Sequence, residues 1–593
     1  MENSVTDRED TKSGDYLALY ETWFEAAQQA NRDAAEEANR ARDYVDGRQL
    51  TDKEVAELRK RGQPDIVINR IRRKVEFLKG LEIRTRTDPK AFPRSPEHEQ
   101  GAEAATDSIR FVCENQDWDQ KRTAVYDNML TEGYGGVEVI HQQMKDGQTE
   151  VVINQYPWDM LFYDPHSRRK DFSDARYKGV AIWMDLDELP DEAQKAVEAM
   201  QTEFAKYAQH EDKPSIQEWF DGGRKRVRIV LMWAKQDGQW RYCYFVKGHK
   251  IADGESPYVD EDDESSCPLI MQSGYVGRQN DRYGVVRDMF GPQDEVNKRR
   301  SKALHQVTTR QVIMTKGAAD PATIRREVAK PDGVIEINGG AEDRFEINSN
   351  ADLSTGQFAL LQEAKAEMDL QGANAALAGE TGESTSGRAV LARQQGGMTE
   401  IAAFQDGLHS FTREVYRHIW MRIRQFWTEE RWIRVTDDER NVRFVGLNQP
   451  VTLMDQLSQL PEEQLIPAVR EMGLGPNDPR LAQVVGIQNR VEELDVDILI
   501  EEVPDRVTLQ GEMFEALLKY AQAGTIPPQV LIEADPSLPT KKKEQLLEGL
   551  RQQQPPDPKA MADVEETMAS AQKKQAETAR IAQEMQQPQI IGA

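Results

Sequence analysis

The order of segments in the middle of the chain constrains its fold more than any other feature. A long helical pattern over Tyr283–Met314 is followed by a compact segment, Thr315–Asn350, and then by a second helical pattern, Ser354–Ala378. A loop rich in Gly, Ser and Thr then leads into a third and longer helical pattern, Arg388–Glu430. With hairpin-like segments on both sides, this order predicts a mixed α+β fold that is mainly α.

Local signals refine these segments. Pro292 predicts a start or kink early in the first helix, and two alternating runs around Asn338-Gly339-Gly340 predict a hairpin in the compact segment. Ser354 can cap the second helix, whose residues Phe358, Leu361 and Met368 are expected on one side. Gly396-Gly397 predicts a kink in the third helix, at a cost of about 1 kcal/mol per glycine. The apolar residues of that helix recur at steps of three and four, as Ile401, Phe404, Leu408, Phe411 and Val415.

The N-terminal flank reads as helices followed by hairpins. An amphipathic helix is expected over Asp15–Asp46, and Thr51 with Glu54 forms a capping-box pattern. The further expectations for this flank are a helix from Asn69 to near Gly80, a helix around Glu103–Asn115, hairpins turning at Asp146-Gly147 and Asp237-Gly238, and a surface helix over Leu189–His210.

The C-terminal flank begins with a hairpin in RWIRVTDDERNVRFVGLN and a strand in ELDVDILIEEV. Helices punctuated by proline are expected over Gly511–Gly549. The tail Met561–Met585 shows a thin heptad stripe, compatible either with a barrel of many parallel copies or with a solvated terminal helix.

The charge balance distinguishes tight binding of DNA from weak contact with DNA that slides past. The chain has 593 residues, with 76 Lys+Arg against 103 Asp+Glu and a formal charge of -27. Such acidity argues against tight binding through phosphate neutralisation, but it suits the wall of a channel past which DNA slides. Two basic runs stand out, one from Arg70 to Lys74 and one within Arg282–Lys316. The first is expected to be a solvated helix face, whereas the second either contacts a partner or is likewise solvated.

The loop before the third helix resembles a phosphate-binding loop only in part. From Gly382 it reads GESTSGRA, and the pattern G-x-x-x-x-G-K-[ST] requires Lys and Ser/Thr where Arg388 and Ala389 stand. The preceding segment is helical in pattern, whereas a phosphate-binding loop follows a strand. Nucleotide hydrolysis is therefore not expected from this loop.

Other chemical sites are equally unsupported, so neither catalytic residues nor cofactors are expected. The cysteines Cys113, Cys243 and Cys267 are far apart, and the eight histidines show no metalloprotease spacing. The acidic run Asp260–Glu264 lacks the alternating ligand spacing of a calcium loop and is expected to be solvated. No apolar run of roughly 18 residues predicts a membrane span, and the polar start does not read as a signal peptide.

Three stretches together resemble portal proteins of tailed bacteriophages, in particular those of short-tailed phages: YGVVRDMFGPQDEVNKRRSKALHQ, PDGVIEINGG and TGESTSGRAVLARQQGGM. The resemblance covers the chain from about Asp15 to Leu509. It implies a ring of about twelve subunits around a DNA channel at one capsid vertex. It also implies that terminase drives double-stranded DNA through the channel and that tail or adaptor proteins dock beneath it.

The resemblance divides the chain into regions with the usual portal names: an N-terminal wing (1–282), a first stem helix (283–314), a clip (315–350), a second stem helix (351–378), a tunnel loop (379–388), a long kinked helix with further wing strands (389–506), crown helices (507–550), and a linker with a short C-terminal helix (551–593). It further implies a virion protein made in the host bacterial cytoplasm. Its partners are copies of itself, the terminase large subunit, tail or adaptor proteins, and capsid and scaffold proteins, with no membrane.

Candidate site residues follow from the same resemblance. The tunnel-loop set, expected to face passing DNA, comprises Glu383, Ser384, Thr385, Ser386, Gly387 and Arg388. The stem set, expected to meet DNA or a neighbouring subunit, comprises Arg287, Lys298, Arg299, Arg300 and Lys302. The clip set, expected to contact terminase or an adaptor, comprises Asp332, Glu336, Asn338, Asp343 and Arg344. Two other functions stay open: a nucleotide-hydrolysing packaging motor subunit, and a minor capsid or scaffold protein without a channel.

Overall fold

The computed structural model describes a defined set of residues, and its chain divides into two units. The described residues are 16–84, 86, 88–96, 99–145, 147–195, 197–198, 219–221, 224–308, 310–316, 319–328, 330, 332–337, 345–349, 351–370, 387–436, 442–458, 478–494, 496–500, 517 and 531. The first unit comprises residues 1–435 and 442–501. The predicted crown helices and C-terminal tail belong to the second unit and lie almost wholly outside the described residues.

Two antiparallel sheets form the β part of the first unit. One has three strands in the order β10-β2-β3: β10 (Leu269–Ser273), β2 (Tyr134–Gln143) and β3 (Thr149–Tyr156). The larger one has six: β4 (Leu161–Tyr163), β5 (Tyr177–Asp185), β6 (Phe220–Asp221), β7 (Arg226–Gln236), β8 (Gln239–Val246) and β9 (His249–Glu255). Both predicted hairpins are confirmed, with β2 paired to β3 and β7 paired to β8. Asp237 and Gly238 have φ values of 49° and 85°, the left-handed pair that a two-residue type I′ turn requires.

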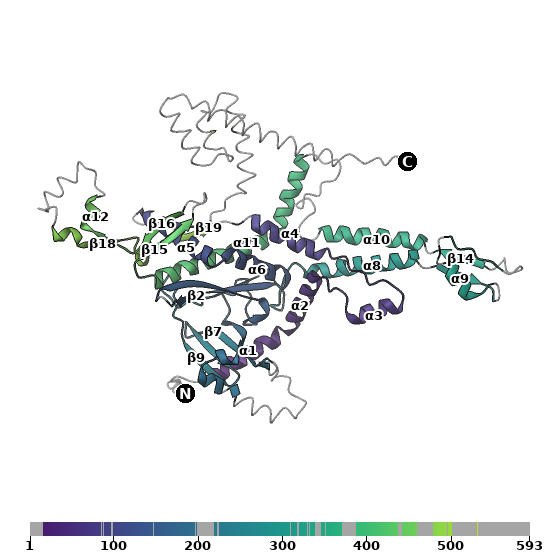
Figure 1. Ribbon diagram of the computed structural model, residues 1–593, viewed down its shortest axis with the longest axis horizontal. Coiled ribbons are helices and arrows are strands. Elements are labelled where there is room, and N and C mark those ends of the chain that lie inside the picture. Colours follow the sequence, from purple (N-terminus) through teal and green to yellow (C-terminus); the bar gives the residue numbers. More distant parts are fainter. Residues whose placement is uncertain are drawn as a thin grey trace, which may run out of the picture. The chain divides into compact units, whose positions relative to one another are not determined.

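The helices that accompany these sheets differ from the predictions mainly at their ends. They are α1 (Leu17–Ala30), α2 (Arg32–Asp46), α3 (Asp52–Lys60), α4 (Ile71–Arg84), α5 (Glu99–Asn115), α6 (Trp118–Thr131) and α11 (Gly387–Phe426). The single helix predicted from Asp15 is two helices, because the chain breaks at Asn31, a residue type that favours helix ends. α4 continues past Gly80, and α6 was missed by the sequence analysis. α1 packs on the larger sheet through Tyr20 and Phe24 (Figure 1).

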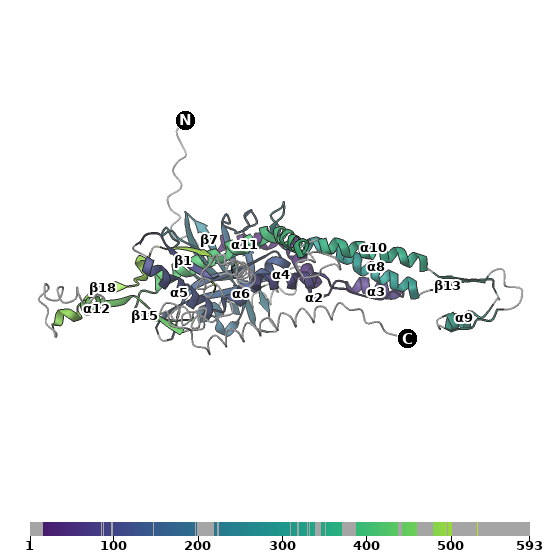
Figure 2. The ribbon, with the colours of Figure 1, turned by 90° about the horizontal axis from the view of Figure 1, so that it is seen from above.

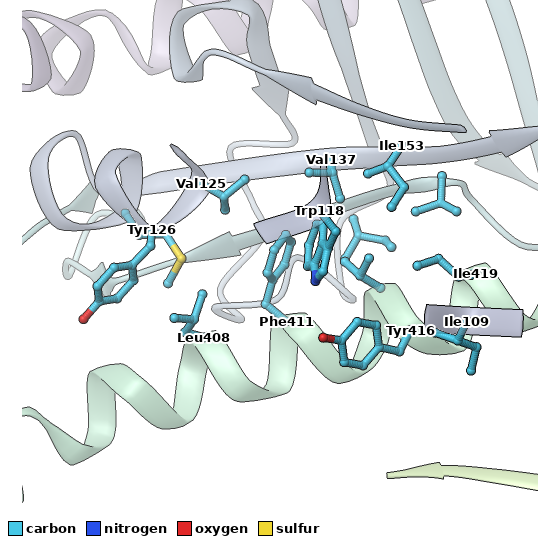
Figure 3. Close-up of a cluster of buried hydrophobic side chains, with 14 of the residues drawn as sticks. Ile109, Trp118, Val125, Tyr126, Val137, Ile153, Leu408, Phe411, Tyr416 and Ile419 are labelled. Carbon is cyan, nitrogen blue, oxygen red and sulfur yellow. The ribbon is translucent and has the colours of Figure 1, made fainter. Parts of the chain in front are cut away.

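The main core lies where α5, α6 and α11 pack on the three-stranded sheet. Trp118 of α6 is 1% exposed and lies beside Phe411 and Tyr416 of α11, with ring centroids 6.2 and 6.3 Å away. Figure 3 shows these rings beneath Val137 of β2 and Ile153 of β3. The predicted stripe of α11 is confirmed for Phe404, Leu408, Phe411 and Val415, whose side chains are all buried there, while the side chain of Ile401 lies outside the described residues. The three-stranded sheet is thus covered by a long helix whose spacing the sequence showed directly.

The two central helices form an antiparallel pair, but the segment between them is not folded as predicted. α8 (Phe290–Thr308) and α10 (Ala351–Leu370) lie side by side (Figures 1 and 2). β13 (Arg310–Met314) follows α8 and pairs with β14 (Phe345–Ser349), which precedes α10. The hairpin predicted at Asn338-Gly339-Gly340 is therefore wrong. β14 pairs with β13, the strand that follows α8, because the adjacent helices α8 and α10 bring the end of α8 close to the start of α10.

The boundaries of this helical pair also differ from the prediction. The first helix was expected from Tyr283 to Met314, but Arg282–Tyr283 is strand β12, paired with β11 (Tyr275–Val276), and the helix begins at Phe290. On α10, Leu361 and Met368 are buried whereas Phe358 is 38% exposed, so these three do not share one buried side. Residues 371–378 of the expected second helix lie outside the described residues. A short helix between the strands, α9 (Pro321–Val328), was not predicted.

The remaining described elements confirm two predictions and leave one untested. β15 (Arg431–Thr436) pairs with β16 (Val442–Leu447), and the predicted strand in ELDVDILIEEV is β19 (Val496–Ile500), paired with β1 (Pro89–Pro93). Figure 1 shows α11 changing direction along its length, but its assignment to Gly396-Gly397 stays a prediction. The other described elements are β17 (Gln449–Thr452), α12 (Leu453–Ser458), β18 (Val484–Gln488) and 3-10 turns at Trp158–Met160, Leu186–Glu188, Arg287–Met289, Pro479–Ala482 and Val491–Glu493. None of the described helices has the length and apolar character needed to cross a bilayer.

Candidate functional site: the α8–α10 hairpin and its anchoring segment

The predicted tunnel loop lies largely outside the described residues. This applies to Glu383, Ser384, Thr385 and Ser386, while Gly387 and Arg388 are the first two residues of α11. Helix α11 therefore begins at Gly387, one residue before Arg388, which was predicted to be the last residue of the loop. Its contact with DNA stays a prediction.

The predicted clip set is described only in part. Asp332 and Glu336 are exposed in a segment without helix or strand, and Asn338, Asp343 and Arg344 lie outside the described residues. The nearby helix α9 begins after Asp320, whose carboxylate accepts hydrogen bonds from the Thr323 backbone N–H and hydroxyl at 3.0 and 2.8 Å. This capping pattern, Asp-Pro followed by Thr, was the signal in the sequence that could have revealed the helix.

The predicted stem cations do not form one patch, and two of them are engaged within the chain. Arg287 lies before α8 and forms ion pairs of 2.7 Å with both Glu37 and Asp281. Burial by itself would lower the pKa of Arg287, but these carboxylates outweigh it and raise the pKa above its usual value. Arg299 pairs with Glu295 one turn earlier at 2.8 Å and donates to Gln357 of α10 at 3.3 Å. Arg287 and Arg299 therefore act within the subunit.

The other three cations lie on two sides of α8. Lys298 and Lys302 are one helical turn apart and both exposed, and Lys298 is 3.8 Å from Asp294. Arg300 is two residues from Lys298, which places it about 200° around the helix and so nearly opposite. Within the described part of the chain, neither Arg300 nor Lys302 forms an ion pair. The stem set thus presents cations on two separate faces, of which a channel could line only one.

A further side of α8 is covered by residues 62–74, which we name the anchoring segment. It passes along a stripe of polar residues spaced four apart on α8, and its last residues belong to α4. Asn297 accepts a hydrogen bond from the Ile68 backbone N–H at 2.9 Å, and its amide donates to Gln49 at 2.6 Å. Gln293 donates to the Ile68 carbonyl at 2.8 Å and accepts from the Arg70 backbone N–H at 3.2 Å.

The stripe continues for two more helical turns. The Ser301 hydroxyl donates to the Pro64 carbonyl at 2.6 Å, and His305 Nδ1 lies 3.1 Å from the Gly62 carbonyl oxygen. Gln293, Asn297 and Ser301 are all buried, at 0 to 3% exposure. Because buried main-chain groups need partners, these side chains take the place that a neighbouring strand or helix would otherwise fill. Sequence reasoning missed the stripe, since spaced polar residues usually indicate a solvated face.

The anchoring segment also reaches α10. The Arg70 guanidinium contacts both carboxylate oxygens of Asp369, at 3.0 and 3.2 Å. Lys74 is only 8% exposed, and its ammonium donates to the carbonyl of Met368, in the last turn of α10. Two of the four cations predicted to form a solvated face therefore bind the end of α10, whereas Arg72 and Arg73 are exposed as expected.

The described residues show no arrangement for metal-dependent chemistry. No group of three or more His, Cys, Asp or Glu among them is placed to hold a metal ion. In the acidic run, Asp260 accepts hydrogen bonds from the backbone N–H groups of Asp262 and Glu264, and Glu261 pairs with Arg94 and Arg417. The run is a charged surface turn that binds neighbouring cations of the same chain.

In the described residues, the two sheets with helices α1, α2, α4, α5, α6 and α11 form a packed body, and the α8–α10 hairpin is anchored to it with charge on its exposed faces. This arrangement indicates a structural subunit. Comparison with known families agrees: the chain belongs to the phage P22-like portal protein family, whose model matches residues 21–591. It is also similar to the portal protein of Helicobacter pylori bacteriophage KHP30, with 21% identity over 422 residues. That match covers 69% of this chain and 66% of the relative, slightly less than two thirds of the relative's length.

Family membership confirms the resemblance seen in the sequence. Portal proteins are structural rather than enzymatic components of the bacteriophage capsid, connecting head to tail and serving DNA packaging. The chain is placed in that class by a match extending over nearly its whole length.

Proposed function

We propose that this chain is the subunit of a portal ring, of about twelve copies, that surrounds a DNA channel at one capsid vertex. The observation that supports it most is the family match across residues 21–591. In this proposal terminase drives the genome through the channel, and tail or adaptor proteins later dock below it. Capsid and scaffold proteins surround the ring, which is made in the host cytoplasm and carried in the virion.

The regions of the subunit are assigned on the same basis. We assign the wing to residues 1–282 and 389–506, the stem to α8 and α10, and the clip to the segment between these helices. Residues 379–388 are the tunnel loop, and residues 507–550 form the crown. Asp332 and Glu336 are available for terminase or adaptor contact because both are exposed. The chain itself performs no catalysis in this proposal.

Electron microscopy of the purified protein tests the ring. Class averages with rotational symmetry and a central hole are the expected result, and a stable oligomer of another geometry would contradict the proposal. If monomers dominate, mass photometry over a rising concentration series should show them closing into one large species. Failure to do so at any concentration, even with the scaffold protein present, also contradicts it.

The alternative of a packaging motor is tested by ATP turnover. The purified chain, with and without DNA, is expected to hydrolyse ATP no faster than a buffer control. Turnover stimulated by DNA would favour the motor and overturn the structural assignment.

The tunnel-loop role is tested by Arg388→Glu. A cation at the channel rim would attract passing phosphates, so the reversal should lower packaged DNA length or retention while rings still assemble. Packaging equal to wild type in this variant would remove Arg388 from the proposed role.

The two faces of α8 can be separated by charge reversal. Because Lys298 and Lys302 lie opposite Arg300, a variant with Lys298→Glu and Lys302→Glu should affect a different step from Arg300→Glu. One variant is expected to change DNA packaging with rings intact, and the other to change ring closure. If both leave assembly, packaging and DNA retention untouched, these cations have neither role.

A further inference from the structure

We infer that the anchoring segment, residues 62–74, is the element that fixes the register of both stem helices, α8 and α10, against the body. Within this segment, Arg70 and Lys74 are the positioning residues that contact α10. The structural part of this inference stands on contacts within one chain. Its consequence for DNA rests on the portal function proposed above. Nothing in the sequence pattern alone pointed to this segment.

The first step of the argument is the difference between apolar and polar contact. α10 packs on α8, and its Leu361, Ala364 and Met368, all at most 2% exposed, belong to the same buried apolar cluster as Val296 of α8. Apolar burial is non-directional, so such a pair could shift along its axis at modest cost. Hydrogen bonds weaken steeply when their geometry is lost, and a buried polar group left unpaired destabilises the fold. Polar contacts to the body therefore select one register.

The second step is the extent of the contact. From Gln293 to His305 the stripe covers just over three helical turns, roughly 18 Å of α8 at 1.5 Å per residue. Four successive side chains contact four points of one extended segment. A displacement of α8 by one turn would require all of these contacts to break together.

The third step is that one residue links both helices to the body. The Arg70 backbone N–H donates to Gln293 of α8, and its guanidinium contacts Asp369 of α10. Lys74, one turn later, binds the Met368 carbonyl, one of the last four of α10 that lack an intrahelical partner. A cation at this end is also favoured by the helix dipole. The end of α10 is thus held at the point from which the chain runs towards the predicted tunnel loop.

The fourth step connects this contact to the rest of the body. Lys79 of α4, the helix that begins immediately after Arg70, lies 3.3 Å from Asp127 of α6, and Arg42 of α2 contacts Asp127 and Glu132 at 2.8 and 2.5 Å. α4 is therefore fixed to α2 and α6 by partly buried ion pairs while its first turns hold α10. In a portal ring, force on the stem would pass through α4 to the body. Loss of the contacts made by the anchoring segment would lower DNA retention without preventing the subunits from assembling.

A charge-swap experiment tests the inference. The variants are Arg70→Asp, Asp369→Arg and the two combined. The matched control is Arg72→Asp, which makes the same charge change as Arg70→Asp at an exposed position two residues further along the chain, in the first turn of α4. Each is measured by hydrogen exchange in the last turn of α10, by ring formation in electron microscopy, and by the DNA retained in particles after mild heating.

The single reversals at Arg70 and Asp369 should speed exchange in the last turn of α10 by about fivefold relative to Arg72→Asp, the effect of roughly 1 kcal/mol. They should lower DNA retention by a similar factor while rings still form. The combined swap should return both quantities to within about twofold of the control. The inference is overturned if Arg70→Asp behaves like Arg72→Asp, if the swap restores nothing, or if the single variants abolish ring closure.

Two further outcomes are distinguishable. Exchange could follow the expected order while particles assembled without this protein retain DNA as well as wild-type particles do. In that case the inference about the anchoring segment stands and the proposed portal function fails. If the charge variants do not fold, Lys74→Met replaces them, because it keeps the side chain's apolar length. It should speed exchange at the end of α10 with the unfolding of the body unchanged, and no change in that exchange would overturn the inference.

Discussion

The body and the stem hairpin are stabilised by different means. In the body, α6 and α11 pack on the three-stranded sheet through large apolar side chains such as Trp118 and Phe411, both at most 1% exposed. On the stem, α8 is held to the anchoring segment by buried Gln293, Asn297 and Ser301, and it leaves Leu304 and Val307 38% and 54% exposed. Trp118 is thus enclosed by apolar side chains of the body, whereas α8 leaves apolar side chains exposed and relies on polar contacts to the anchoring segment.

The difference shows how apolar and polar contacts divide their tasks. Apolar burial supplies most of the free energy of folding and tolerates small rearrangements, so it suits a thick body. Hydrogen bonds contribute less net free energy but fix positions, so they suit a thin element that must hold one register. If this division is right, substitutions in the body should act mainly on global stability and substitutions on the stem mainly on local structure.

The largest effect is expected in the body from Trp118→Ala. Removing this ring leaves a cavity beside Phe411 and Tyr416 and should lower the free energy of unfolding by about 3–5 kcal/mol. Thermal and denaturant unfolding measure it, with Trp432→Ala as the control because Trp432 is 62% exposed. Equal losses in the two variants would show that the core is not centred on Trp118.

A smaller effect is expected on the stem from Asn297→Ala. The substitution leaves the partly buried Ile68 N–H without its acceptor and should cost about 1–3 kcal/mol. Hydrogen exchange at Ile68 and along α8 should rise, with Lys302→Ala, on the exposed side of the same helix, as the control. If global unfolding and local exchange change by the same amount, the stem is not a separately held element.

The third prediction concerns pH and Glu138, a buried carboxylate that links the two sheets. It accepts hydrogen bonds from the Tyr156 hydroxyl at 2.9 Å and from Trp233 Nε1 at 3.2 Å. Burial raises its pKa above the usual value of 4.5. The folded state therefore keeps a proton that the unfolded state loses, so the free energy of unfolding should fall as pH rises from 4.5 through the folded-state pKa.

Glu138→Gln isolates this contribution. The amide cannot ionise but still offers an oxygen acceptor, so the variant should show a flatter fall of stability over that pH range. Because the two donors use different carboxylate oxygens and the amide offers only one, the slope with pH, rather than the absolute stability, is the quantity to compare. Denaturant unfolding at several pH values provides the measurement, and an unchanged slope would mean that Glu138 is ionised in the folded protein.

The smallest global effect is expected from Thr51→Ala. The Glu54 N–H donates to the Thr51 hydroxyl at 3.3 Å, and the Thr51 N–H donates to the Glu54 carboxylate at 2.9 Å. Losing this capping box should destabilise α3 locally by about 1 kcal/mol. Because α3 has no buried residues, the unfolding of the whole protein should hardly change. Thr51→Ser, which keeps the hydroxyl, should show normal exchange in α3; a global loss in Thr51→Ala would mean that α3 supports the body.

The sequence was informative wherever structure depends on near neighbours. The capping box at Thr51, the turn at Asp237-Gly238 and the buried stripe of α11 were all confirmed, because each is set by residues a few positions apart. The resemblance to portal proteins was confirmed for a similar reason, since it rested on short combined motifs. Features that depend on residues close together in the chain can be predicted from the sequence alone.

The tertiary structure decided which distant segments meet. β14 pairs with β13 rather than with its near neighbour, Arg287 and Arg299 turn inwards to carboxylates, and Arg70 and Lys74 bind the end of α10. The sequence by itself thus determined the family, the helical order and the local turns and caps. Only the fold determined the role of each polar residue, because a charge or an amide has the same pattern in sequence whether it faces water or a partner about 300 positions away.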